Sequence, residues 1–281
     1  MMIKPVHKIL FIIAAVLLLS FEVCAFDIKV QPKKVAPGDV FYLKIAGTES
    51  AGATVRFQDN DYSFYPSKDN ALIALVPVDI NTKAKDYILT VSKGHETQTV
   101  KITVQPHKFK TIHLSLPEGK VTLSPEDQER AAREDALLNK LWPQDNTRSW
   151  DGRFTPPTDT EVATMFGVTR IMNKVKTSVH RGIDLRGKTG TPVKALNSGK
   201  VVLNDDLFFG GNTLIIDHGT GLFSVYMHLS RINVAAGESV SKGQTIGLIG
   251  MSGRATGPHL HLSVKLRGIS INPESLFKLE L

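Results

Sequence analysis

Histidines and one aspartate gather in short motifs in the second half of this sequence. His259 and His261 are separated by a single residue, and His180 and Asp184 lie four residues apart with Gly182 between them. Imidazole nitrogen and carboxylate oxygen are ligands that zinc takes in proteins, and a catalytic zinc site offers about three protein ligands plus a water. Two histidines and one carboxylate complete such a set. The remaining histidines could act as acid or base, because imidazole titrates near neutral pH.

The spacing brings several of these side chains together if the surrounding chain is extended. Side chains two residues apart in a strand point to the same face of a sheet, so His259 and His261 would face one cleft. The same period applies to Tyr226 and His228, which would project a phenol and an imidazole together. His218 differs, because it lies in an Asp-His-Gly turn where we expect a structural role.

Two stretches of short strands must position these residues. From residue 26 to residue 105, about seven short apolar segments alternate with turns, which indicates an immunoglobulin-like β-sandwich without a chemical motif. Residues 151–281 contain strand-like segments punctuated by glycine and show no helical period. Residues 106–150 form a more polar linker with one helix over about 125–142, capped by Ser124. The expected fold class is all-β, with a helical linker between two β domains.

Residues 1–25 carry the pattern of a secretory signal peptide. A positively charged start precedes an uncharged apolar run over 9–19, which is shorter than the ~20 residues of a spanning helix. Cleavage after Ala25 would remove Cys24, the one cysteine, so no intrachain disulfide is possible. We expect an exported protein, periplasmic, in the cell envelope or secreted, with no stable membrane insertion after cleavage. Export disfavours nucleic acid, although the net charge of +7 indicates an anionic partner.

In this order and among these glycines, the motifs resemble the lysostaphin/LytM-type zinc metallopeptidases of bacterial cell walls. The resemblance covers roughly residues 160–275. It rests on FGVTRIMNKVKTSVHRGID at 166–184, GTPV at 190–193, DHG at 217–219, YMHL at 226–229, GQTIG at 243–247 and GPHLH at 257–261. The resemblance implies a compact set of antiparallel sheets with the site in a groove between loops.

The resemblance also implies which residues carry the chemistry. It gives His180, Asp184 and His261 as ligands of one zinc ion per chain, and His228 and His259 as catalytic histidines. The implied function is a metalloendopeptidase that hydrolyses peptide cross-links in peptidoglycan, with the stem peptides as its partner. Which histidine is the base stays open. The scissile bond also stays open between a D-Ala–diaminopimelate link and a glycine bridge.

Other interpretations remain beside this one. A non-catalytic wall-binding or amidase-activating module is the alternative, although such degenerate relatives lack ligands and this sequence keeps every position. A metal-storage or sensing protein would need a closed ligand shell. Arg170 and Asn173 could line the groove or shape its loop. The front sandwich could position the catalytic domain, bind a wall-associated protein or occlude the groove. We expect a fragment beginning near Gly152 to fold alone.

Overall fold

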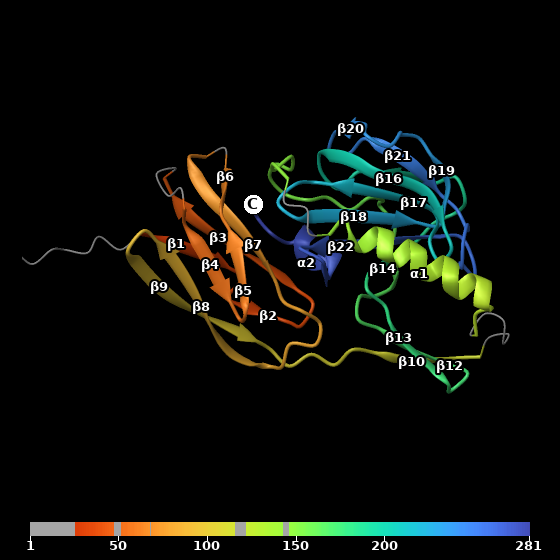
Figure 1. Ribbon diagram of the computed structural model, residues 1–281, viewed down its shortest axis with the longest axis horizontal. Coiled ribbons are helices and arrows are strands. Elements are labelled where there is room, and N and C mark those ends of the chain that lie inside the picture. The colour runs from red at the N-terminus through yellow and green to blue at the C-terminus, as the bar shows by residue number, and fades with distance from the viewer. Residues whose placement is uncertain (1–25, 48–51, 68, 116–121, 143–145) are drawn as a thin grey trace, which may run out of the picture.

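The computed structural model describes residues 26–47, 52–67, 69–115, 122–142 and 146–281. The predicted signal peptide, residues 1–25, lies outside the described residues. Two β-rich parts lie side by side, joined by an extended segment and a helix (Figure 1). In the described ranges, no helix combines the length and the apolar character needed to cross a bilayer.

The front part is a sandwich of two β-sheets. One sheet has the order β1 (Ile28–Gln31), β3 (Val40–Ala46), β7 (Ala71–Pro77) and β6 (Tyr65–Ser67). The other has the order β2 (Lys34–Val35), β9 (Glu96–Val104), β8 (Lys85–Lys93), β4 (Thr54–Phe57) and β5 (Asn60–Ser63). Buried side chains from both sheets, among them Phe41, Phe57 and Leu89, form the core between them. The predicted β-rich front domain is present, and its immunoglobulin-like identity stays a prediction.

Strand β7 is buried along its whole length because both of its faces are covered. Ala74 and Val76 point into the core of the sandwich. Ile73 and Leu75, on the opposite face, belong to the core of the C-terminal part. Side chains of a strand alternate between the two faces of its sheet, so the sheet that contains β7 is a layer shared by both parts of the molecule. The uninterrupted apolar run of β7 follows from this double burial.

The linker contains a strand as well as the predicted helix. β10 (Thr111–Leu114) pairs in parallel with β12 (Thr169–Met172), which pairs antiparallel with β13 (Lys176–Val179). Helix α1 (Pro125–Asn139) begins after Ser124, whose Oγ accepts the Asp127 N–H at 3.1 Å, so the predicted cap is confirmed. Beyond the helix, Trp142 is 7% exposed and packs edge-on against Phe223 with ring centroids 5.5 Å apart.

The rest of the C-terminal part consists of one large sheet and one small sheet. The large sheet has the order β11 (Val162–Thr164), β14 (Ile183–Arg186), β22 (His259–Leu266), β18 (Leu222–Met227), β17 (Gly211–Asp217), β16 (Gly199–Leu207) and β20 (Ser239–Val240), with β23 (Ile269–Ile271) paired to β22. The small sheet has the order β15 (Pro192–Lys194), β21 (Thr245–Ile249) and β19 (Leu229–Ile232). A short helix, α2 (Pro273–Phe277), packs against the front sandwich, where Val40 N–H donates to Ser275 Oγ at 3.1 Å. The sequence analysis did not predict α2, because its five residues span less than two turns and show no helical period.

A buried hydrogen-bond network holds the centre of the large sheet. His218 Nδ1–H donates to the Ser198 carbonyl at 2.8 Å. Ser224 Oγ is hydrogen-bonded to His218 Nε2 at 2.8 Å and to Tyr226 Oη at 3.1 Å. The Leu196 N–H donates to the same Tyr226 oxygen at 3.0 Å. His218 is therefore a satisfied core residue, as the turn motif predicted.

Candidate active site

The strand register brings the first and last motifs together. Asp184 on β14 lies directly opposite His261 on the neighbouring strand β22. His180 follows β13 immediately and reaches the same point from the other side. Gly182 allows the chain between His180 and Asp184 to run close to β22, because a Cβ at this position would lie 2.4 Å from the Leu262 carbonyl oxygen.

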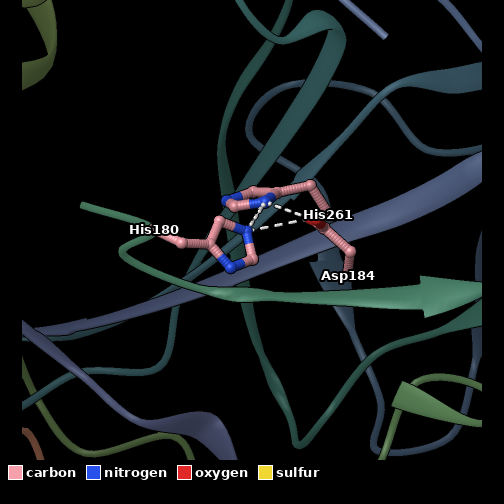
Figure 2. Close-up of side chains that lie close together, drawn as sticks. All are labelled: His180, Asp184 and His261. Atoms are coloured by element: carbon pink, nitrogen blue, oxygen red, sulfur yellow. Dashed lines mark hydrogen bonds and ion pairs between the residues drawn. The ribbon is translucent and has the colours of Figure 1, made fainter. Parts of the chain in front are cut away.

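The three side chains converge on one point (Figure 2). Asp184 Oδ1 lies 2.9 Å from His180 Nε2 and 2.8 Å from His261 Nδ1. The two imidazole nitrogens are 3.0 Å apart. Zinc binds histidine and aspartate at about 2.0–2.2 Å, so donors of a tetrahedral zinc site lie roughly 3.3 Å from each other. The donor types and their separations therefore fit a zinc ion with small outward shifts.

Hydrogen bonds behind the donor set orient both imidazoles. His180 Nδ1–H donates to the Met165 carbonyl at 2.9 Å, so Nε2 is the ring nitrogen that faces Asp184. His261 Nε2 is hydrogen-bonded to Ser263 Oγ at 2.8 Å, on the side of the ring away from Nδ1. Metal-binding histidines usually have such a partner for the second ring nitrogen, because it fixes the tautomer and the ring orientation.

The Asp184 carboxylate is charged and held in position, so it can bind a cation. Its second oxygen, Oδ2, accepts a hydrogen bond from Arg170 Nη2 at 2.8 Å. Burial disfavours the charged form, but hydrogen bonds from His180 and His261 outweigh burial and hold the pKa of Asp184 well below its usual range. The group is therefore a carboxylate at any pH at which the protein would work.

The other two histidines of the motifs face the same groove. His228 Nδ1–H donates to the Ser252 carbonyl at 2.9 Å, and His259 Nδ1–H donates to the Gly257 carbonyl at 2.8 Å. In the neutral tautomers that result, Nε2 of each ring is an acceptor. The ring centroids are 4.7 Å apart, and His259 Nε2 lies 3.9 Å from Asp184 Oδ1. Two basic nitrogens thus lie beside the candidate metal site.

The prediction that Tyr226 and His228 share one face is wrong. Tyr226 is fully buried in the core, and the next residue, Met227, lines the groove instead. His228 has a φ of 63°, in the left-handed region, which interrupts the alternation of β18 and turns the imidazole to the groove. Burial lowers the pKa of His228 to about 4. The hydrogen bond to the Ser252 carbonyl opposes this shift, and the neighbouring His259 and His261 add smaller contributions to it. His228 is therefore neutral at neutral pH.

Two glycines fix the loop that holds His228. Gly211 and Gly253 have φ values of 58° and 66°, and a Cβ on Gly211 would lie 2.4 Å from Gly253 N. The adjacent Ser252 Oγ accepts the Asn212 N–H and donates to the Leu229 carbonyl, each at 2.9 Å. The Ser252 carbonyl that accepts from His228 is therefore rigidly placed.

A groove of about 1100 Å³ contains all of these groups. Its apolar lining comes from Ile112, Leu114, Ala163, Met172, Phe209, Met227 and Pro258. Arg170 lines the groove, whereas Asn173 lies in the turn after β12 and donates its N–H to the Leu114 carbonyl at 2.8 Å. Of the two roles left open by the sequence, Arg170 thus lines the groove and Asn173 shapes the adjacent loop. The sequence interpretation missed Ile112 and Leu114, although their alternation with Thr111 and His113 was a strand signal.

Known proteins resemble the part of the chain that carries this site. Residues 178–273 match the model of Peptidase family M23. The peptidoglycan DD-endopeptidase ShyA of Vibrio cholerae is 44% identical over 93 residues, which are 33% of this chain and 22% of ShyA. The DD-carboxypeptidase/endopeptidase Mpg of Neisseria meningitidis is 39% identical over 98 residues, which are 35% of this chain and 23% of Mpg. The match thus spans about a fifth of the length of each of these curated relatives.

The likeness to a solved structure extends beyond this domain. A crystal structure of a putative M23 peptidase from Pseudomonas aeruginosa has 27% sequence identity and a TM-score of 0.62, and the match covers 86% of this chain and 94% of that one. The C-terminal part of this chain is an M23 peptidase domain of the lysostaphin/LytM type. The arrangement of a front β domain before an M23 domain therefore occurs in a second protein.

Proposed function

We propose that this protein is an exported zinc metalloendopeptidase that hydrolyses peptide cross-links of bacterial peptidoglycan. The observation that carries the proposal is the convergence of His180, Asp184 and His261 in a groove that also holds His228 and His259. The relatives named as peptidoglycan DD-endopeptidases support a D,D cross-link as the substrate, in preference to a glycine bridge. Export through a signal at residues 1–25 would deliver the protein to this substrate.

His180, Asp184 and His261 would hold the zinc ion. When bound, zinc lowers the pKa of a coordinated water toward ~7 and polarises the scissile carbonyl. Asp184 contributes the negative charge of the donor set, and Arg170 holds its other oxygen. Met165 and Ser263 orient the two imidazoles through hydrogen bonds to their second nitrogens.

His228 and His259 would move the protons of the reaction. Each donates its Nδ1–H to a backbone carbonyl, so the free lone pair on Nε2 can accept a proton from the attacking water. The same pair can then protonate the leaving amine, which must depart as a neutral group. Protonated imidazole beside the carbonyl would also stabilise the developing oxyanion.

The charge of the groove suits an anionic peptide. Arg170, Arg186 and Arg254 line it, while Asp184 is the one carboxylate among the described lining residues. Clefts lined by one sign of charge concentrate ligands of the opposite sign. The free carboxylates of stem peptides meet this requirement.

The domain assignment belongs to the same proposal. We assign residues 26–105 to an immunoglobulin-like sandwich, 106–150 to the linker and 151–281 to the peptidase domain. A wall-associated protein would be a further partner of the sandwich, on the faces that the peptidase domain does not cover.

Digestion of purified peptidoglycan tests the proposal. The full mature chain is incubated with sacculi, with and without a chelator, and new amino and carboxyl termini are identified by mass spectrometry. We expect chelator-sensitive cleavage at a D,D cross-link, and no cleavage by the His261→Ala variant. Cleavage at a glycine bridge would correct the substrate. Tight binding to sacculi without new termini would favour the non-catalytic alternative.

A further inference from the structure

One wall of the groove comes from the linker, far in sequence from the candidate metal ligands. Strand β10 forms an edge of the three-stranded linker sheet, β10-β12-β13, which lies apart from the large sheet (Figure 1). Ile112 and Leu114, two residues apart on this strand, line the groove. Thr111 and His113 alternate with them and are exposed. The strand therefore has an apolar face toward the groove and a polar face away from it.

The apolar face continues across the linker sheet. The register places Ile112 opposite Arg170 and Arg170 opposite Ser178, and it places Leu114 opposite Met172. All five residues line the groove. Directly opposed residues of paired strands project to the same face. These five residues of one face of the sheet thus form a groove wall, and β10 supplies its apolar edge.

β10 is built into the peptidase domain and does not merely lie against it. The Thr169 N–H donates to the Lys110 carbonyl at 2.9 Å, just before β10 begins. The ring of Phe109 packs on Gly167, where a Cβ would lie 2.1 Å from the ring. Gly167 N–H in turn donates to the carbonyl of the candidate ligand His180 at 2.8 Å. The linker therefore supports the loop that carries part of the site, and its groove-facing side chains have fixed positions.

We propose that Ile112 and Leu114 are specificity-determining residues that bind an aliphatic side chain of the substrate peptide. Arg170, their polar neighbour on the wall, is engaged by Asp184, so the contacts that β10 and β12 offer here are apolar. Both side chains are half-buried in the free protein, and a methyl group of the substrate would remove part of their remaining surface from water. The wall thus selects alanine over glycine beside the scissile bond. This inference rests on the proposed peptidase function.

The test compares full-length variants on two soluble cross-linked peptides that differ only by alanine or glycine at the residue that donates the scissile carbonyl. We expect Ile112→Ser/Leu114→Ser to lower kcat/KM on the alanine peptide about tenfold or more, mainly through KM. The preference for alanine over glycine should shrink toward unity. The matched control, Thr111→Ser/His113→Ser, changes the opposite face of the same strand and should keep both values. Ile112→Val/Leu114→Met should restore the preference.

Zinc content and thermal midpoint are measured for every variant. If the serine variant loses zinc or unfolds, the alanine-to-glycine ratio of the single variant Ile112→Ala decides the question. A folded, zinc-loaded variant that keeps the wild-type ratio would overturn this inference alone. Calorimetric binding of an uncross-linked stem peptide separates the two proposals: wild-type protein that binds this peptide more tightly than the serine variant, yet cleaves neither cross-linked peptide, would overturn the peptidase function and leave the apolar wall in place.

Discussion

Arg170 Nη2 lies 2.8 Å from Asp184 Oδ2, while both candidate zinc-binding histidines contact the other oxygen of the same carboxylate. The Arg170 side chain is 30% exposed and that of Asp184 is 10% exposed, so the ion pair is shielded from solvent. Arg170 belongs to β12, whose neighbour β10 comes from the linker. The Arg170–Asp184 ion pair thus connects the linker sheet, β10-β12-β13, to the candidate metal site. It also gives Asp184 a fixed orientation.

Arg170→Ala should weaken zinc binding about 10–100-fold, as is usual when a partner of a metal ligand is removed. The carboxylate would lose its Oδ2 hydrogen bond and rotate more freely. Competition with a chromophoric chelator measures the affinity. Arg181→Ala is the matched control, because Arg181 is exposed and adjacent to His180 in sequence. Equal zinc affinity in the Arg170 and Arg181 variants would contradict a positioning role for Arg170.

Loss of a zinc ligand should weaken zinc binding more than loss of the residue that forms a hydrogen bond to that ligand. His261→Ala removes one of three protein donors, so we expect both tight zinc binding and peptide hydrolysis to disappear. Ser263→Ala, which removes only the partner of His261 Nε2, should retain zinc with reduced affinity. Metal analysis of both purified variants gives the answer. Full zinc occupancy in His261→Ala would show that the ligand assignment is wrong.

The other two histidines should separate metal binding from catalysis. His228→Ala and His259→Ala are expected to bind one zinc ion and to lose hydrolysis by a factor of ~10²–10⁴, the usual size of general acid–base effects. Their Nε2 atoms face the groove, and their Nδ1–H groups are used by backbone carbonyls. Rates on a soluble cross-linked peptide are compared at equal zinc occupancy. A folded variant without zinc would identify that histidine as a ligand.

Buried His218 should make the fold sensitive to acid. Burial lowers its pKa from 6.5 to about 4 in the folded protein, with smaller opposing effects of the Ser198 carbonyl and Asp217. Below pH 6.5 the unfolded chain takes up a proton that the folded protein excludes, so the free energy of unfolding falls as the pH falls. The loss is complete near pH 4 and amounts to about 3 kcal/mol at 1.36 kcal/mol per pKa unit.

Urea unfolding between pH 7 and pH 4 measures this dependence. The His218→Asn variant lacks the titrating group, so its stability should be lower at pH 7 but should fall less steeply with acid. Other histidines titrate equally in both proteins, and the difference between the two curves isolates His218. Parallel curves for wild type and variant would contradict the assignment.

The sequence predicted well the features that depend on local patterns. Strand pairing brings His259 and His261 to one groove because their spacing equals the period of a strand. Ser124 predicted the start of α1, because a helix cap is also a local feature of the sequence. His228 could not be placed by this period, because its φ of 63° interrupts the alternation of the strand, and its backbone N–H donates to the distant Gly210 carbonyl at 2.7 Å.

Long-range features were harder to predict from the sequence. β10 becomes a strand through pairing with β12, more than 50 residues later in the chain. The apolar run of β7 was visible, but a sequence does not say what covers each face. In the structure, Ile73 and Leu75 pack in the core of the peptidase domain. The two domains therefore share a core that their separate sequence patterns did not indicate.

This shared core changes what is expected of a truncated protein. A fragment beginning at Gly152 would lack Trp150, which is 2% exposed in the core of the C-terminal part, together with β10 and the sandwich residues Ile73 and Leu75. Each fully buried apolar side chain contributes about 1.5–3 kcal/mol, so the loss is comparable to the stability of a whole domain. We expect this fragment to aggregate or to melt well below the full mature chain, against the autonomy that the sequence suggested.

A fragment beginning at His107 provides the comparison that isolates the linker. It keeps β10, α1 and Trp150 and lacks only the sandwich, so it should be more stable than the Gly152 fragment and should retain more zinc. Thermal unfolding and metal analysis of both fragments and of the full mature chain measure the two contributions. A soluble, zinc-loaded Gly152 fragment with the thermal midpoint of the full chain would show that neither the linker nor the sandwich stabilises the peptidase domain. A His107 fragment with full activity on soluble peptides would place every substrate contact outside the sandwich, and would leave the sandwich to act on the intact wall.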